Sequence, residues 1–163
     1  TNTAPGIFRN FSFNNWKNFP QQTFQEIKEQ LIQKQNLNPL IKLSGFDIDK
    51  SAVEKAKLNY IQTKLPNTLI NFETKDFQDL EFRNFAFSTI ICNPPYGQRL
   101  EDNYQTKMLY QQFGKKYQDA KASSLYFLTP IPELENLIGL KAEKNRKLYN
   151  GTIKCYLYQF HKK

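Results

Sequence analysis

Helical and strand-like spacings of apolar residues alternate along this chain. Phe24, Ile27 and Leu31 recur at intervals of three and four in a polar background, which predicts an amphipathic helix from about residue 20 to residue 35. Short apolar runs predict strands at 40–46, 69–73, 87–92 and 124–129. Because helical spacing returns between the strands, the pattern favours an α/β fold with a mainly parallel sheet.

Two further helices are predicted between these strands. Ser51 and Glu54 have the spacing of a capping box, so a helix is expected to begin there after the first strand. Leu109, Phe113 and Tyr117 recur every four residues after the third strand and predict the inward face of another helix. Each helix therefore connects two strands, as a parallel sheet requires.

The last predicted elements are a short helix and a hairpin. The helix is expected near 133–140, after the fourth strand. Asn150-Gly151 is a strong turn dipeptide, so residues 144–149 and 152–161 are predicted to pair as a closing antiparallel hairpin.

The predicted strand at 87–92 stops at Asn93-Pro94-Pro95-Tyr96. A short apolar run ended by turn residues is typical of a buried, parallel strand. The two prolines forbid further ladder hydrogen bonds and stiffen the backbone just beyond it. In open α/β sheets, ligands bind at this carboxyl end of the strands.

This four-residue motif suits the methylation of a planar exocyclic amine. Such an amine is a weak nucleophile because its lone pair is delocalised into the ring. The side-chain oxygen of Asn93 and the carbonyl of Pro94 can accept its two N–H bonds, which directs the lone pair toward a methyl donor. Tyr96 offers a flat face for stacking the base, and the rigid prolines keep both acceptors in place. The alternative is a proline-rich turn, begun by Asn93, without a function.

Acidic residues follow the two preceding strands. Asp47, at the end of the first strand, is placed to accept both hydroxyls of a ribose. Asp76 follows the second strand, where it can accept from the 6-amino group of an adenine. A cap or turn role is commoner for any single Asp, and Asp49 and Asp79 are expected to be caps or surface carboxylates. The ordered set, completed by Asn93, predicts a nucleoside-containing cofactor at one edge of one sheet.

The charge of the chain is strongly positive and unevenly distributed. The 163 residues carry 23 Lys and Arg against 15 Asp and Glu, a formal net charge of +8. Residues 141–163 hold most of the excess, with seven basic residues against the single acid Glu143. A basic patch of this kind suits a polyanion such as RNA, with a solvated basic tail as the alternative.

Composition excludes several other classes of protein. Cys92 and Cys155 fall in separate predicted strands without CxxC or histidine-rich spacing, so neither a disulfide nor a metal site is indicated. No apolar run approaches the ~18 residues of a membrane span, and no signal peptide opens the sequence. A soluble, cytoplasmic protein of one domain, without a membrane partner, is therefore expected.

Four segments of the sequence match one family of enzymes. They are Ala-Pro-Gly-x-x-Arg-x-Phe-x-Phe-x-x-Trp (4–16), Gly-Phe-Asp-Ile-Asp (45–49), Asn-Pro-Pro-Tyr-Gly-x-Arg-Leu (93–100) and Lys-Leu-Tyr-Asn-Gly (147–151). On these motifs, which span the chain, the sequence resembles the bacterial 23S rRNA guanine-N2 methyltransferases whose full-length members carry an N-terminal THUMP domain. The resemblance implies a Rossmann-like methyltransferase fold, S-adenosylmethionine as methyl donor, and 23S rRNA as partner.

The resemblance also implies roles for individual residues. The implied catalytic residues, which would hold the target guanine, are Asn93, Pro94, Pro95 and Tyr96. The predicted cofactor-binding residues are Asp47, Ile48, Asp76, Phe77 and Asn93. With the basic patch included, the predicted RNA-binding residues are Arg99, Lys144, Arg146 and Lys147. An ordinary surface ion pair is an equal alternative for Arg99.

One part of the family pattern is absent from this sequence. In these enzymes a Gly-rich strand-turn-helix precedes the Ala-Pro-Gly segment and cradles the methionine part of the cofactor. The six glycines here are never within three residues of one another, so none forms such a turn. Residues 1–163 are therefore expected to be the C-terminal portion of the methyltransferase domain, without the Gly-rich strand and the THUMP domain, and inactive alone.

The absent strand has an expected place in the sheet and an expected consequence. It would lie between the strands that end at Asp47 and Cys92, so its neighbours should expose unpaired edges and favour self-association.

Two other functions stay open. One is a methyltransferase that uses the same motif on DNA adenine or a protein glutamine amide, against which the Gly97-x-Arg99-Leu100 string and the Ala-Pro-Gly segment weigh. The other is a noncatalytic RNA-binding module that keeps only the basic face, which the absent Gly-rich turn favours.

Overall fold

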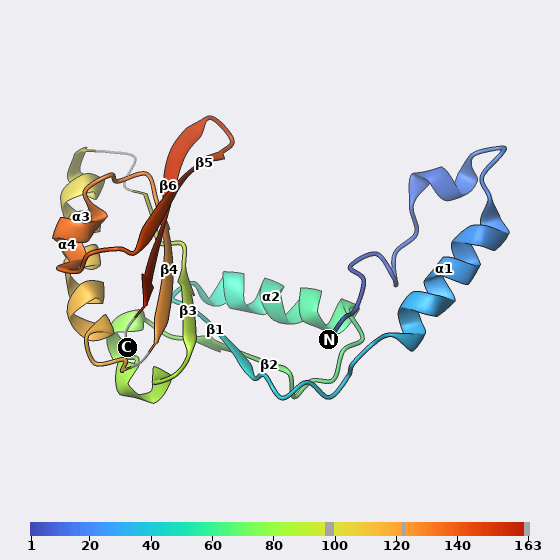
Figure 1. Cartoon of the computed structure of the whole chain (residues 1–163), viewed down its shortest axis with the longest axis horizontal. Coiled ribbons are helices and arrows are strands. Elements are labelled where there is room, and N and C mark those ends of the chain that lie inside the picture. Colours follow the sequence, from blue (N-terminus) through green and yellow to red (C-terminus); the bar gives the residue numbers. More distant parts are fainter. Residues whose placement is uncertain (97–99, 122, 162–163) are drawn as a thin grey trace. The chain divides into compact units, whose positions relative to one another are not determined.

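The computed structural model describes residues 1–96, 100–121 and 123–161 of the chain (Figure 1). The chain divides into two compact units, Thr1–Asp76 and Phe77–Lys163. No helix within the described ranges is long and apolar enough to cross a membrane.

The first unit is built around one β-α-β segment. Strands β1 (Leu43–Asp47) and β2 (Ile70–Thr74) pair in parallel, and helix α2 (Lys50–Gln62) connects them. Val53 on α2 and Leu69 just before β2 are buried in this unit. A parallel pair needs a crossover connection, which the alternation of strand and helix spacings predicted.

Asp49, rather than Ser51, caps α2. Its carboxylate accepts hydrogen bonds from the backbone N–H of Ser51 (2.7 Å) and from the Ser51 hydroxyl (3.0 Å), and these bonds lower the pKa of Asp49. The predicted capping box from Ser51 to Glu54 is therefore wrong, because a carboxylate two residues earlier takes the cap position. The prediction of a cap role for Asp49 is confirmed.

The segment before β1 holds the 3-10 helix Ser12–Asn15, helix α1 (Gln21–Gln33) and an aromatic cluster that begins at Phe11. The ring centroid of Phe13 lies 4.9 Å from that of Phe11 and 5.8 Å from that of Phe24 on α1. The predicted amphipathic helix is thus present. None of its residues is fully buried, however, and Ile27 and Leu31 of its apolar stripe are exposed.

The second unit is a four-stranded sheet of order β3-β4-β6-β5. Its strands are β3 (Thr89–Cys92), β4 (Ser124–Thr129), β5 (Lys144–Asn150) and β6 (Ile153–His161). β3 and β4 are parallel, whereas β6 runs antiparallel to both β4 and β5. The helices of the unit are the 3-10 helices Phe77–Asp79 and Phe82–Phe85, α3 (Leu100–Tyr117) and α4 (Leu134–Ile138). Figure 1 shows α3 and α4 on one face of this sheet.

Aromatic residues form the core between α3 and β4. The ring centroid of Phe127 lies 5.0 Å from that of Tyr110 and 5.3 Å from that of Phe113. Tyr117 is fully buried, and its hydroxyl donates to the Ser123 carbonyl at 2.9 Å. The inward face of α3 therefore carries Tyr110 where the periodicity predicted Leu109, while the other two predicted positions are confirmed.

The predicted closing hairpin is present, with its turn one residue later than predicted. Asn150 pairs with Ile153, so Gly151 and Thr152 form a two-residue turn. Gly151 has a φ of 62°, a left-handed conformation that glycine adopts without a steric penalty.

Strand β3 starts later and is more exposed than predicted. Phe87 has a φ of 60° and is 87% exposed, so the strand begins at Thr89 and not at 87. Ile91, within the strand, is 80% exposed. The prediction of a buried strand is wrong, because β3 lies at the edge of its sheet and its described pairing is with β4 alone. The predicted parallel pairing is confirmed.

The α/β architecture is confirmed, but the described strands form two sheets. One holds β1 and β2, and the other holds β3 to β6, so β1 and β3 each have an open edge among the described residues. Because the two strands belong to different units, their common direction in one sheet stays a prediction.

Candidate active site

The Asn-Pro-Pro-Tyr motif directly follows the carboxyl end of β3. Cys92 pairs with Phe127 on β4, so Asn93 begins the motif beside the last residues of β4, which ends at Thr129. The exposed side chain of Asn93 is accessible to a ligand. The motif thus occupies the sheet edge at which the carboxyl ends of two parallel strands meet, the ligand-binding edge of α/β sheets.

A short chain of hydrogen bonds links the motif to the hairpin. The Tyr96 hydroxyl donates to Oδ1 of Asn93 at 2.9 Å. Nδ2 of Asn150, at the end of β5, donates in turn to the Tyr96 hydroxyl oxygen at 3.4 Å. The amide oxygen of Asn93 has two lone pairs, so it can accept a second hydrogen bond, from a substrate amine, while Tyr96 fixes its orientation.

A second hydrogen-bonded chain fixes the motif backbone from within the core. The hydroxyl of the fully buried Tyr110 donates to the Pro95 carbonyl at 3.1 Å and lies 3.1 Å from Oγ1 of Thr129. Thr129 is also buried, and its Oγ1 accepts from the backbone N–H of Ile131 at 3.1 Å. Each of these hydroxyls can donate one hydrogen bond and accept another, so the chain is fully satisfied.

Three titratable groups in or beside the motif are neutral. Burial raises the pKa of the Cys92 thiol to about 12 and that of the Tyr110 hydroxyl to about 12. Burial also raises the pKa of Tyr96. At neutral pH the tyrosine hydroxyls keep their protons and act as donors, and Cys92 is a thiol and not a nucleophilic thiolate. The motif therefore offers neutral oxygen acceptors.

In the first unit, the structure brings together three predicted cofactor-binding residues. Asp47 pairs with Thr74 at the ends of β1 and β2, and the backbone N–H of Lys75 donates to the Asp47 carbonyl at 2.9 Å. Asp76 follows one residue later, so both acids lie at the same edge of this pair. The Asp47 carboxylate is exposed and accepts from the backbone N–H of Asp49 at 2.9 Å, and Ile48 is 70% exposed.

Phe77 and Asn93 belong to the second unit, so the structure describes the two parts of the predicted cofactor site separately. The Phe77 ring packs on Phe113, with 5.6 Å between the ring centroids. Among the predicted RNA-binding residues, Lys144, Arg146 and Lys147 lie on β5 and are exposed. Arg99 lies outside the described residues.

Sequence reasoning missed three residues that support the motif. Tyr110 and Asn150 form hydrogen bonds to it, and Thr129 lies within hydrogen-bond distance of the Tyr110 hydroxyl. A signal existed for Tyr110, because it stands three and seven residues before the inward-facing Phe113 and Tyr117. A buried tyrosine needs a partner for its hydroxyl, and the nearby Pro95 carbonyl supplies one. No local pattern pointed to Thr129 or Asn150, because their contacts depend on the tertiary fold.

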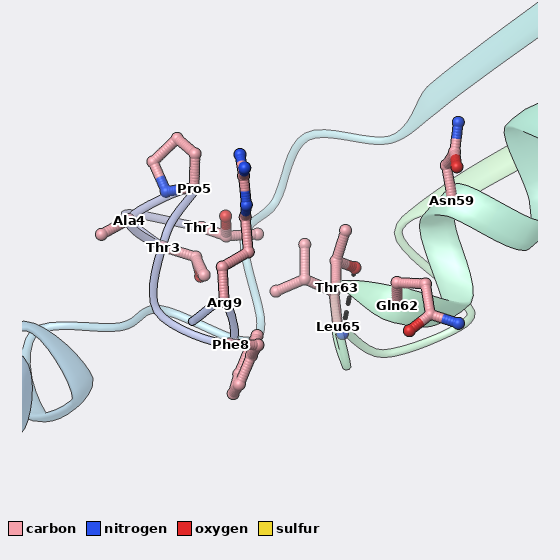
Figure 2. A pocket seen from close by; sticks show the side chains of 10 residues that line it. All are labelled: Thr1, Thr3, Ala4, Pro5, Phe8, Arg9, Asn59, Gln62, Thr63 and Leu65. Carbon is pink, nitrogen blue, oxygen red and sulfur yellow. Dashed lines mark hydrogen bonds between the residues drawn. The ribbon is translucent and has the colours of Figure 1, made fainter. Parts of the chain in front are cut away.

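A pocket of about 350 Å³ opens elsewhere in the first unit (Figure 2). It lies between the first turn of the chain, including Ala4 and Arg9, and the carboxyl end of α2, including Gln62 and Thr63. The 13 residues of α2 span about 20 Å, and Asp47 lies just before the other end of the helix. The pocket is therefore at the opposite end of α2 from Asp47. Within the described ranges, no group of three or more His, Cys, Asp or Glu side chains is placed to hold a metal ion.

Comparisons with known proteins identify the chain as a methyltransferase domain. Residues 1–159 match the family described as "RMKL-like, methyltransferase domain", and the chain belongs to this family. It is 32% identical over 162 residues to "Putative RNA methyltransferase YpsC" of Bacillus subtilis (strain 168), covering 99% of this chain and 42% of that protein. It is 34% identical over 162 residues to "Ribosomal RNA large subunit methyltransferase K/L" of Legionella pneumophila (strain Lens), covering 95% and 22% respectively.

A solved structure is also similar to this chain in its fold. The crystal structure described as "SMU.472, a putative methyltransferase complexed with SAH" matches with a TM-score of 0.90 and 33% identity, over 99% of this chain and 42% of that one. SAH is what remains of S-adenosylmethionine after it gives up its methyl group. The predicted family, the Rossmann-like methyltransferase fold and S-adenosylmethionine as the cofactor of the family are confirmed. The chain spans less than half the length of the relatives that it matches.

Proposed function

We propose that this chain carries the target-binding part of an S-adenosylmethionine-dependent methyltransferase that modifies the exocyclic N2 amine of a guanine in 23S rRNA. The observation that carries the proposal is the geometry of Asn93, whose exposed amide oxygen is oriented by the Tyr96 hydroxyl 2.9 Å away. Beside it, the backbone of the motif is held at Pro95 by the buried Tyr110.

Neutral acceptors suit this reaction. S-adenosylmethionine supplies an electrophilic methyl group on a positively charged sulfur. As the nitrogen–carbon bond forms and the carbon–sulfur bond breaks, positive charge moves to the amine and SAH leaves as a neutral thioether. The Asn93 oxygen and the Pro94 carbonyl accept the amine N–H bonds, which strengthen as this charge develops. The amine then loses one proton to water, so no charged base is required at the motif.

Residues of the first unit suit the nucleoside part of the cofactor. Asp47 presents an exposed carboxylate at the end of β1, a position typical for binding ribose hydroxyls. Asp76 follows at the end of β2, on the same edge, where it can accept from an adenine amine. The name of the Legionella relative and the basic strand β5 support ribosomal RNA as the substrate.

We further infer that residues 1–163 are the C-terminal portion of the methyltransferase domain. The support is the division of the described strands into two sheets, with β1 and β3 both at open edges. A further strand would satisfy such an open edge and carry the Gly-rich turn that holds the methionine part of the cofactor. Alone, the chain is expected to bind the cofactor weakly and to self-associate through these edges.

Identification of the methylated product tests the proposed function. The full-length protein that contains this chain would be incubated with S-adenosylmethionine and deproteinised 23S rRNA, and the nucleosides analysed by mass spectrometry. We expect N2-methylguanosine, lost in Asn93→Ala but formed normally by Asn84→Ala, a control at an exposed position in the same unit. Methylated adenine in DNA or a methylated glutamine, without N2-methylguanosine, would show that the alternative substrates are correct. RNA binding without any methyl transfer would favour the noncatalytic module.

A further inference from the structure

The β5–β6 hairpin carries two lysines and two tyrosines on one face. Lys147 pairs with Tyr156, and Tyr149 pairs with Lys154. Opposite residues of an antiparallel ladder point to the same side, as do alternate residues of one strand. These four side chains therefore form a patch in which rings and ammonium groups alternate, here called the hairpin patch.

Contacts within the hairpin patch keep its rings and charges close together. The ammonium nitrogen of Lys147 lies 5.9 Å from the ring centroid of Tyr149, and that of Lys154 lies 5.1 Å from the ring centroid of Tyr156. Interaction with Tyr156 raises the pKa of Lys154, so this lysine stays charged. Tyr149 is 66% exposed, which leaves its ring available for stacking.

All charged residues of the hairpin are basic. Residues 144–161 contain no Asp or Glu, so the lysines of the patch have no acidic neighbour along either strand. Lys144 and Arg146 on β5 add to the charge. Exposed aromatic rings interleaved with cations are the surface that single-stranded nucleic acid selects, because rings stack with bases and cations attract phosphates.

The hairpin patch is tied to the supports of the motif through β4. Tyr156 lies opposite Thr129 on β4, and Oγ1 of Thr129 lies 3.1 Å from the Tyr110 hydroxyl. Asn150, whose side chain reaches the Tyr96 hydroxyl, directly follows Tyr149, so their side chains point to opposite faces of the hairpin. The hairpin thus contacts the motif through Asn150 and carries the hairpin patch on its other face.

We propose that the hairpin patch binds the unpaired nucleotides next to the target guanine, with the exposed ring of Tyr149 stacking on a base and Lys147 and Lys154 pairing with phosphates. This inference rests on the proposed function. A paired stem hides the faces of its bases, so a stacking surface requires single-stranded RNA around the target. The patch would hold the neighbours of the guanine while Asn93 and Pro94 hold its amine.

Binding measurements on the full-length protein test this proposal. The probes are a fluorescently labelled single-stranded oligoribonucleotide with one guanine and a duplex of the same length, with affinity read by fluorescence anisotropy. We expect Tyr149→Ala to weaken single-strand binding by roughly 10-fold or more and duplex binding much less, with Tyr149→Phe close to wild type. Lys154→Ala should weaken binding of the single strand and reduce the slope of log affinity against log salt by about 0.7.

Two substitutions on α3 serve as matched controls. Tyr104 is 70% exposed, close to the exposure of Tyr149, and Lys107 is exposed like Lys154, so Tyr104→Ala and Lys107→Ala should leave single-strand affinity unchanged. The proposal is overturned if Tyr149→Ala retains wild-type affinity, or if it weakens single-strand and duplex binding equally. Methyl transfer measured on the same preparations distinguishes a failure of the hairpin-patch proposal from a failure of the proposed function. Guanine methylation with normal binding by Tyr149→Ala contradicts the hairpin patch alone, whereas Tyr149-dependent binding without methylation contradicts the proposed function alone.

Discussion

The two units differ in how completely their side chains are buried. In the second unit, Tyr110, Tyr117 and Phe127 are entirely enclosed between α3 and β4. In the first unit, α1 has no buried residue and the buried apolar side chains are few, Val53 and Leu69 among them. The motif that is predicted to hold the base is therefore fixed by a well-packed core, whereas Asp47 and Asp76 stand at the edge of a thin β-α-β layer.

The largest expected effect tests this difference in packing. Phe127→Ala removes a fully buried ring and should lower the free energy of unfolding by about 3–5 kcal/mol. Phe72→Ala in the first unit removes a half-buried ring, 6.0 Å from that of Tyr60, and should lower it by less than half as much. Urea unfolding followed by circular dichroism measures both, with the exposed Phe87→Ala as control. Equal losses would mean that the two units are equally well packed.

The next prediction contrasts the chemical roles of the two units. In the full-length protein, Asn93→Ala should reduce kcat on the order of 10²-fold and leave cofactor affinity nearly unchanged, because its amide oxygen matters most as charge develops on the amine. Asp47→Ala should chiefly weaken cofactor binding. Steady-state kinetics and calorimetric titration with S-adenosylmethionine measure both properties. The assignment of roles is reversed if the two variants exchange phenotypes.

A smaller effect is expected where the core of the second unit meets the motif. Tyr110→Phe keeps the buried ring but removes the hydroxyl that donates to the Pro95 carbonyl, and should lower kcat roughly 3- to 10-fold. Tyr117→Phe on the same helix also removes a buried hydroxyl, which donates to the Ser123 carbonyl far from the motif. Tyr117→Phe should lower the free energy of unfolding about as much as Tyr110→Phe does, without changing kcat. A loss of kcat in both variants would argue for a general packing effect.

The smallest predicted effect concerns the cap of α2 in the first unit. Hydrogen bonds from Ser51 lower the folded-state pKa of Asp49 below its unfolded value. Asp49 therefore stabilises the folded unit above the unfolded-state pKa, and this stabilisation is lost as pH falls through the lower folded-state pKa. Thermal unfolding should show Asp49→Ala slightly less stable than wild type at pH 7, with the difference disappearing in strong acid. A difference that persists there would mean that the charge of the cap is unimportant.

Elements with strong local signals could be predicted from the sequence. Strand β4, bounded by turn residues and Pro130, has the predicted limits of 124–129, and Asn150-Gly151 correctly located the hairpin. The start of β3 could not be predicted, because nothing in the apolar run indicates that Phe87 takes a left-handed conformation. Its exposure depends on what lies beside the strand, which no periodicity records.

The candidate site likewise contains residues whose positions the sequence predicted and residues that it did not reveal. The positions of Asn93 and Asp47 could be predicted, because Asn93 directly follows β3 and Asp47 ends β1, where parallel sheets place ligand-binding groups. Tyr110 and Asn150 form hydrogen bonds to the motif across 15 and 54 residues of sequence, and Thr129 reaches Tyr110 across 19 residues. Such contacts are set by how α3, β4 and β5 pack together and leave no trace in local spacing.

The hydrogen bond from Asn150 to Tyr96 also has a consequence for the order of folding. The Tyr96–Asn93 bond closes within a single turn of chain, whereas the Asn150–Tyr96 bond spans 54 residues. Contacts between distant residues form late, because the loop must close before they contribute. During synthesis the motif leaves the ribosome before β5 and β6, so the Asn150–Tyr96 hydrogen bond cannot form until the hairpin has also emerged. A nascent chain interrupted before the hairpin would therefore display the motif without the side chain that completes its support.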